Sequence, residues 1–181
     1  MGCLHVYTGN GKGKTTAAVG LAVRAAGAGR RVAFCQFDKG FEGGCEHYNE
    51  RASLRALPLI DLFVFGVERL MPDGKYRFNN LPDDFAQARV GLEKAKELVR
   101  DGGYFLVVCD EAVACVMTKL YTEDDLLELA RVFRAEGKCD LVLTGRGASP
   151  RLIEAADLVT DMTLVKHYFY TGVAAREGIE Y

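Results

Sequence analysis

The chain has 181 residues, of which 49% are hydrophobic and 27% are charged, and its formal net charge at pH 7 is −2. This length and composition predict one globular domain over residues 1–181 with a substantial hydrophobic core. The slight negative charge argues against non-specific binding to nucleic acid or to an anionic membrane, and the lack of a membrane-length apolar run or a signal-peptide pattern predicts a cytoplasmic protein.

A glycine-rich loop lies close to the start of the chain, between two segments that read as regular structure. Residues 3–7 form an apolar run typical of a strand, and residues 17–26 have the composition of a helix. This order predicts a phosphate-binding loop, because glycines let successive backbone N–H groups surround an anion at the positive end of a helix. The residues that we expect to bind a nucleotide here are Gly9, Asn10, Gly11, Lys12, Gly13, Lys14, Thr15 and Thr16.

Two side chains of this loop have specific expected roles. The Lys14 ammonium supplies charge to the outer phosphates, and the Thr15 hydroxyl is a ligand for Mg²⁺. The usual phosphate-loop pattern begins with glycine at the position that Thr8 occupies in this chain. The alternative, a purely structural turn between a strand and a helix, accounts less well for so many glycine, lysine and threonine residues directly after a strand.

The next part of the chain alternates strands and helices. Residues 31–37 read as a second strand, and their nearly continuous apolar character suits a parallel strand covered on both faces. A weak helical segment at 46–56 and a third strand at 62–65 follow.

None of the six cysteines of the chain is spaced as Cys-x-x-Cys, so the sequence suggests neither a zinc site nor a redox motif.

Residues 66–80 show no evident regular element, and Met71–Lys75 has the composition of a turn. A stretch of this length in a compact domain predicts a lid, a binding loop or local disorder. Beyond it, apolar residues recur every three or four positions and indicate one face of a helix that Gly102 and Gly103 end. These apolar residues are Phe85, Ala88, Leu92, Ala95 and Val99.

A fourth, wholly apolar strand at 104–109 leads into two adjacent carboxylates, Asp110 and Glu111. A carboxylate pair at the carboxyl end of a buried strand is the second part expected of a nucleotide site with a phosphate loop. We expect Asp110 to join the Mg²⁺ shell, directly or through water, with Glu111 beside it as a second metal ligand. The alternative on this segment alone is two solvated acids at the start of a loop.

Capping residues mark the elements in the last third of the chain. Thr122 is expected to cap a helix whose first turn is acidic, and Ser149 to cap a shorter helix that begins with proline. Between them, a fifth strand at 140–144 runs into a polar turn that contains Arg146. A sixth strand at 158–165 is less apolar, which places it nearer an edge of the sheet.

Strands alternating with helices predict an α/β fold with a mostly parallel six-stranded sheet, helices on both faces and right-handed crossovers. In such sheets ligands gather outside the carboxyl ends of the strands. Four polar clusters follow strands and would share this rim: residues 8–16, 36–39, 110–111 and 144–146. The sequence therefore predicts a single ligand site at this rim.

Taken in order, these motifs resemble the P-loop type of ATP:corrinoid adenosyltransferase. The motifs that carry the resemblance are Thr8–Ala18, Gln36-Phe37 with Lys39-Gly40, Asp110-Glu111, Thr144-Gly145-Arg146, Lys166-His167 and Gly178-Ile179-Glu180-Tyr181. They cover residues 3–181, and the loop of this family departs from the common pattern at the position of Thr8 as well. Of the three histidines, only His167 is placed near the site.

The resemblance implies a RecA-like P-loop domain that transfers the 5′-deoxyadenosyl group of ATP to the Co(I) centre of a reduced corrinoid and releases triphosphate, in the biosynthesis or salvage of adenosylcobalamin. The acceptor is either cob(I)alamin or an earlier corrinoid such as cob(I)yrinic acid a,c-diamide. The resemblance also implies Mg²⁺, usually a homodimer, and a reductant protein that supplies Co(I). On this basis we assign catalytic roles to Lys14 and Glu111, metal binding to Thr15, Asp110 and Glu111, and a further phosphate contact to Arg146.

Some members of the family carry an aromatic Gly-Phe-Thr-Trp segment on the corrinoid side, where this chain has Phe65-Gly66-Val67-Glu68 and no tryptophan. We expect residues 66–80 to form the corrinoid-side lid here.

A P-loop NTPase or small-molecule kinase with ordinary γ-phosphoryl transfer is the main alternative, in which Glu111 positions a water or an acceptor hydroxyl. A binding module that uses ATP only as a switch is another. A nucleic-acid motor fits poorly, because no basic stripe with interleaved aromatic residues occurs.

Overall fold

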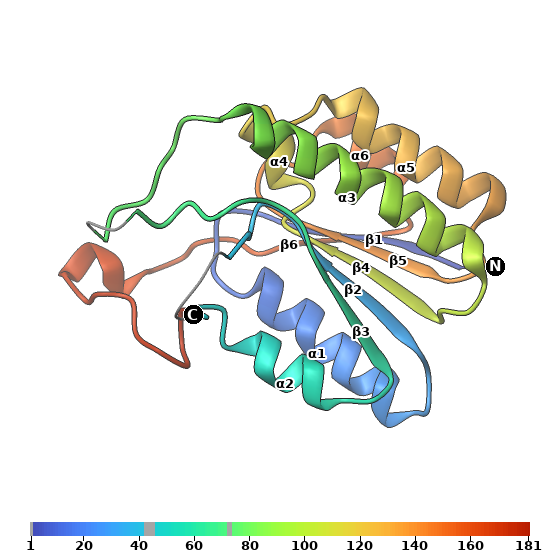
Figure 1. Ribbon diagram of the computed structural model, residues 1–181, viewed down its shortest axis with the longest axis horizontal. Coiled ribbons are helices and arrows are strands. Elements are labelled where there is room, and N and C mark those ends of the chain that lie inside the picture. Colours follow the sequence, from blue (N-terminus) through green and yellow to red (C-terminus); the bar gives the residue numbers. More distant parts are fainter. Residues whose placement is uncertain (1, 42–45, 72–73) are drawn as a thin grey trace.

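Six short strands form one parallel sheet in the computed structural model, which describes residues 2–41, 46–71 and 74–181 (Figure 1). The strands are β1 (Leu4–Thr8), β2 (Val32–Gln36), β3 (Ile60–Val64), β4 (Leu106–Asp110), β5 (Asp140–Thr144) and β6 (Leu158–Asp161). They lie in the order β3-β2-β4-β5-β1-β6, and every neighbouring pair is parallel. β2 and β4 are buried along their whole length, as expected of parallel strands covered on both faces.

Helices cover both faces of this sheet (Figure 1). One face carries α1 (Lys14–Gly27) and α2 (Glu50–Ala56), and the other carries α3 (Pro82–Asp101), α4 (Ala114–Met117), α5 (Glu123–Glu136) and α6 (Pro150–Ala155). A short 3-10 helix, η1 (Tyr168–Thr171), follows β6. Two clusters of buried apolar side chains form the core. The predicted α/β architecture is confirmed. Of the described helices, none combines the length and the apolar character that crossing a membrane requires.

Two helices begin at the capping residues that the sequence predicted. The Thr122 hydroxyl accepts from the Asp125 N–H at 3.2 Å, and the Asp125 carboxylate accepts from the Thr122 N–H at 2.8 Å. At α6, the Ser149 hydroxyl accepts from the Leu152 N–H at 3.2 Å, and Pro150 fills the first helical position. These bonds satisfy N–H groups that have no partner inside the helix, and so they fix where α5 and α6 begin.

Several element boundaries differ from the predicted ones. The second and sixth strands are shorter than expected, the third begins two residues earlier, and the fourth extends to include Asp110. The helix expected at 46–56 begins only at Glu50. Pairing with neighbouring strands sets such limits. The sequence did not predict α4 and η1, because they are too short to produce a periodic pattern. The expected turn residues Pro72 and Asp73 lie outside the described residues.

The parallel arrangement brings the carboxyl ends of the strands to one edge of the sheet. β5 lies between β1, which precedes the glycine loop, and β4, which ends at Asp110. The last residue of β5, Thr144, donates its hydroxyl proton to Asp110 Oδ1 at 2.7 Å and accepts from the Glu111 N–H at 2.9 Å. The strand order therefore places the glycine loop and the carboxylate pair on either side of Thr144.

Gly91 in the middle of α3 tests how closely this helix packs on the sheet. A Cβ at Gly91 would lie 2.7 Å from Phe37 Cε1 and 3.0 Å from Phe65 Cγ, and both rings are buried. We expect Gly91→Ala to lower the free energy of unfolding by about 1–3 kcal/mol, because overpacking outweighs the better helix propensity of alanine.

Gly20→Ala in α1 is the matched control, because no atom other than its chain neighbours and the backbone of its own helix lies within 4 Å of its Cβ position. It should raise the free energy of unfolding by up to about 1 kcal/mol. Urea unfolding of both variants measures the two changes. A gain of stability in Gly91→Ala equal to that of Gly20→Ala would contradict close packing between α3 and the sheet.

Candidate functional site

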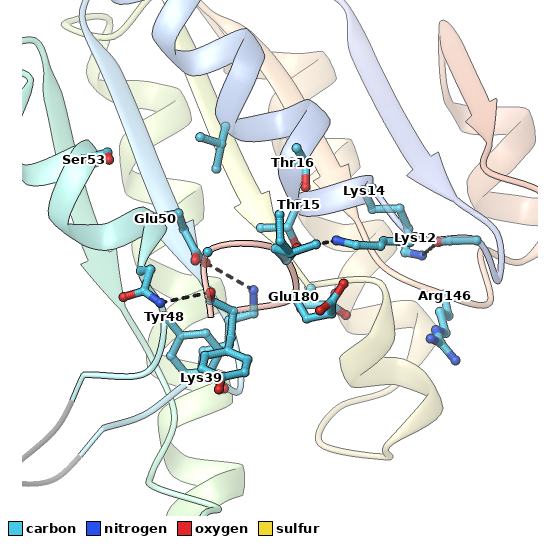
Figure 2. A pocket seen from close by; sticks show the side chains of 18 of the residues that line it. Lys12, Lys14, Thr15, Thr16, Lys39, Tyr48, Glu50, Ser53, Arg146 and Glu180 are labelled. Carbon is cyan, nitrogen blue, oxygen red and sulfur yellow. Dashed lines mark hydrogen bonds and ion pairs between the residues drawn. The ribbon is translucent and has the colours of Figure 1, made fainter. Parts of the chain in front are cut away.

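A cavity of about 680 Å³ opens at the carboxyl edge of the sheet (Figure 2). The predicted residues in its wall are Asn10, Gly11, Lys12, Gly13, Lys14, Thr15, Thr16, Glu111, Arg146 and His167. Gly9 and Asp110 lie outside this wall but bond to residues within it. The structure therefore brings all the predicted site residues together. The wall also contains Lys39, from the rim cluster at 36–39, and residues 178–181, which belong to the motifs of the family resemblance. Tyr48, from the segment between β2 and α2, is a wall residue that the sequence did not indicate.

The glycine loop packs closely on Met162, which directly follows β6. Gly9 and Gly13 have φ angles of 95° and 117°, in the region that favours glycine. The Gly11 N–H donates to the Met162 carbonyl at 2.6 Å, and a Cβ on Gly11 would lie 2.4 Å from that oxygen. Side chains at these positions would displace the loop, so its glycine pattern has both a conformational and a steric reason.

Lys14 is the first residue of α1, and only 6% of its surface is exposed. Its Nζ donates to the carbonyl oxygens of Gly9 and Gly11, each at 2.8 Å. Burial lowers the pKa of Lys14, and the nearby carboxylate of Glu111 opposes this change by favouring the charged form. The ammonium is thus held within the loop, where an incoming anion would meet it.

Asp110 is fully buried at the end of β4 and accepts three side-chain hydrogen bonds. Its Oδ1 accepts from the Thr144 hydroxyl at 2.7 Å. Its Oδ2 accepts from Lys39 Nζ at 2.7 Å and from the Thr15 hydroxyl at 3.2 Å. Interpreting Asp110 as a solvated acid is therefore wrong. A buried carboxylate requires such partners because its removal from water is costly.

Glu111 follows Asp110 with a φ angle of 63°, a conformation that few residues other than glycine adopt. Burial raises the pKa of Glu111, and the negative charge of Asp110 raises it further. The charges of Lys39, Lys14 and Arg146 act in the opposite direction. Arg146 itself is exposed at the border of the cavity. Glu111 therefore lies among the same cations that would attract phosphate groups.

The oxygen atoms of Thr15, Asp110 and Glu111 are the kind of ligand that Mg²⁺ prefers. Within residues 2–41, 46–71 and 74–181, no three His, Cys, Asp or Glu side chains gather in a way that would hold a metal ion. Mg²⁺ commonly binds through one or two carboxylates, with phosphates and water completing its shell. This donor set therefore fits Mg²⁺ that arrives with a nucleotide.

A buried arginine outside the predicted motifs supports the cavity wall. Arg51 in α2 is 1% exposed, and it donates from Nε to Gln36 Oε1 at 2.6 Å and from Nη1 to Glu46 Oε1 at 3.0 Å. Its Nη2 donates to the carbonyl oxygen of Lys39. Gln36 in turn donates to Glu50 at 2.8 Å. In a sequence, one arginine on a short helix gives no signal that distinguishes it from a solvated one.

Residues 178–181 close one side of the cavity (Figure 2). The Ile179 carbonyl accepts from Lys12 Nζ at 2.6 Å, and the Tyr181 carbonyl accepts from Asn49 Nδ2 at 3.0 Å. These partners are 167 and 132 positions apart in the chain. Local patterns carry no information about contacts of this kind, so only the family resemblance pointed to this segment.

Comparison with known proteins gives consistent matches over the full chain. Residues 1–181 match the family described as ATP:corrinoid adenosyltransferase BtuR/CobO/CobP. The chain is 37% identical to the corrinoid adenosyltransferase of Pseudomonas aeruginosa, over 99% of this chain and 84% of the relative. It is 36% identical to the corrinoid adenosyltransferase of Escherichia coli K12 and 35% identical to the corrinoid adenosyltransferase CobA of Salmonella typhimurium, in each case over 99% of this chain and 86% of the relative.

The buried position of Arg51 leads to a stability prediction. Arg51→Gln should lower the free energy of unfolding by about 3–5 kcal/mol, because it leaves buried polar groups of the cavity wall without their partner. Arg55→Gln is the matched control on the same helix, since the Arg55 side chain is 56% exposed and lies 3.6 Å from the same Glu46 carboxylate. Its effect should stay within about 1 kcal/mol. Urea unfolding measures both changes. Equal losses of stability would show that the burial of Arg51 does not determine its contribution to the free energy of unfolding.

Proposed function

This chain belongs to the ATP:corrinoid adenosyltransferase family, and we propose how its cavity carries out the reaction of that family. The chain is a transferase of adenosylcobalamin synthesis, which moves the 5′-deoxyadenosyl group of ATP to the cobalt of a reduced corrinoid and releases triphosphate. The observation that most strongly supports this function is the match to the family over residues 1–181, which includes every motif at the rim of the sheet.

The reaction does not require a nucleophile from the protein, because reduced cobalt is itself the nucleophile. The electron pair of Co(I) forms the new bond to C5′, the bond between C5′ and the phosphate oxygen breaks, and its electron pair leaves with the triphosphate. The cobalt becomes formally Co(III). The protein therefore has to hold C5′ in line with the cobalt, exclude water and stabilise charge on the leaving group.

The glycine loop and its lysines are well placed to bind the triphosphate. Lys14 and Lys12 belong to the loop, and Arg146 borders the same cavity. The Lys14 ammonium donates to two loop carbonyls, and phosphate oxygens would take their place as acceptors. Backbone N–H groups at the start of α1 add the partial positive charge of the helix.

Thr15, Asp110 and Glu111 would hold Mg²⁺ against the phosphates. When bound, Mg²⁺ would neutralise charge on the triphosphate and orient it. The Thr15 hydroxyl at the start of α1 and the Asp110 carboxylate at the end of β4 are already in contact at 3.2 Å. Glu111 adds a carboxylate in the cavity wall beside them.

We place the corrinoid beside residues 66–80, which follow β3 at the carboxyl edge of the sheet. In the described part of this segment, Phe78 is 91% exposed and Tyr76 is 48% exposed. Arg69 anchors the segment through an ion pair with Asp38 at 2.7 Å. Exposed aromatic rings on an anchored segment suit the binding of a flat and largely apolar macrocycle.

The remaining features of the proposal follow from the family resemblance. We expect residues 1–181 to act as one P-loop domain in the cytoplasm, to form a homodimer and to receive Co(I) from a separate reductant protein. Analytical ultracentrifugation measures the oligomeric state, and a single sedimenting species with the mass of one chain would contradict the homodimer.

The reaction products test the proposed function directly. With ATP, Mg²⁺ and chemically reduced cob(I)alamin, the protein should form an adenosylated corrinoid and an equal amount of intact triphosphate. Release of orthophosphate or of a phosphorylated acceptor without corrinoid would instead indicate a P-loop NTPase or a kinase. Nucleotide binding without turnover would indicate a switch-type binding module.

Lys14→Ala should weaken ATP binding by about one to two decades while the protein remains folded, because the ammonium contributes a charge-assisted contact of about 1.5–3 kcal/mol. Calorimetric titration with ATP measures the affinity. Lys94→Ala is a control on α3, where Lys94 pairs with Glu97 at 3.0 Å on the helix surface. Equal ATP affinity for wild type and Lys14→Ala would refute the assignment of the glycine loop to phosphate binding.

Hydrogen exchange tests the placement of the corrinoid. Peptides that cover residues 66–80 should exchange rapidly when only ATP is bound and become protected when corrinoid is added, because the ligand would restrict local opening. Peptides from β2, which is buried along its whole length, should not change and serve as the internal reference. Equal exchange of residues 66–80 in both states would place the acceptor elsewhere on the rim.

A further inference from the structure

Lys39 lies where a cation bound to Asp110 is expected. Its Nζ is 2.7 Å from Asp110 Oδ2, the oxygen that also accepts from the Thr15 hydroxyl at 3.2 Å. Asp110 and Thr15 are two of the groups that fit Mg²⁺, so the ammonium and the metal would meet at one carboxylate oxygen. Charges interact strongly at a fully buried group, so two cations at this oxygen would repel each other.

The backbone that carries Lys39 is fixed in place. The Lys39 N–H donates to the Phe65 carbonyl at 3.2 Å, and the Lys39 carbonyl accepts from the buried Arg51. The next residue, Gly40, packs so closely that a Cβ would lie 2.3 Å from the Gly66 carbonyl oxygen. Rearrangement at this position is therefore confined to the flexible Lys39 side chain.

This side chain forms part of the cavity wall. It is 13% exposed, and its ammonium also lies 3.9 Å from Glu50 and 5.3 Å from the centre of the Tyr48 ring. In Figure 2, Lys39 and Arg146 flank the residues of the glycine loop from different sides. A triphosphate bound by Lys12, Lys14 and Arg146 would thus have Lys39 within the same cavity.

We propose that Lys39 binds the triphosphate during adenosyl transfer, and that its ion pair with Asp110 keeps the ammonium on this carboxylate until Mg²⁺ and ATP bind. The inference rests on the proposed function. When Mg²⁺ binds at Asp110, the Lys39 ammonium leaves this carboxylate. The ammonium then binds phosphate oxygens of the leaving group. Asp110 keeps a cationic partner in both states, so the buried carboxylate is never left uncompensated. The leaving group gains a positive charge where negative charge develops in the transition state.

Lys39→Met tests this exchange, because methionine retains an unbranched apolar stem and lacks the charge. Binding of Mg²⁺ alone to the nucleotide-free protein, measured by calorimetry, should tighten by about one to two decades, which corresponds to one charge-assisted hydrogen bond. The kcat of adenosyl transfer should fall by about the same factor. Lys39→Arg keeps the charge and should have the same Mg²⁺ affinity as the wild type. Lys94→Met, on the surface of α3, should change neither quantity.

Unchanged or weaker Mg²⁺ binding by Lys39→Met would overturn the proposal, and tighter binding with unchanged kcat would refute the triphosphate role. The wild-type protein provides a second measurement that does not depend on the folding of a variant. The NMR signal of the Lys39 Nζ group should shift when MgATP is added, and an unchanged signal would mean that Lys39 stays on Asp110. Triphosphate release by the wild type tests the proposed function separately from either result.

Discussion

The burial of the Asp110 carboxylate is the constraint on which the arrangement of this cavity depends. The carboxylate has no access to water, so its bonding capacity has to be met by side chains from other elements. Its three partners, Thr144, Lys39 and Thr15, come from the end of β5, the segment after β2 and the first turn of α1. One charged group thus fixes three elements relative to β4. The same bonds place the glycine loop beside the groups that suit Mg²⁺.

The parts of the site that depend on local sequence could be predicted. The glycine loop, the apolar strand that ends in Asp110 and the capping residues Thr122 and Ser149 all belong to short segments whose composition has a direct structural cause. The rim could be predicted as well, because parallel strands end at one edge. The confirmed family assignment follows from the same motifs in the same order.

The rest of the site could not be predicted, because it consists of contacts between distant segments. Nothing next to Arg51 in the sequence distinguishes it from the exposed Arg55, and only the packing of α2 on the sheet makes one of them buried. Lys39 belonged to a recognised motif, but its partner Asp110 is 71 positions away. The limits of β2 and β6 were misplaced for a related reason, since they depend on pairing with neighbouring strands.

The edge strand β6 has a consequence for how this protein would lose activity on heating. Its four residues are exposed, and among the described strands it pairs only with β1. Yet the carbonyl of Met162, directly after β6, accepts the hydrogen bond from the Gly11 N–H of the glycine loop. Segments with little burial open at a lower free energy than the core does. We therefore expect the outer wall of the glycine loop to loosen before the sheet melts, so that inactivation by heat precedes global unfolding.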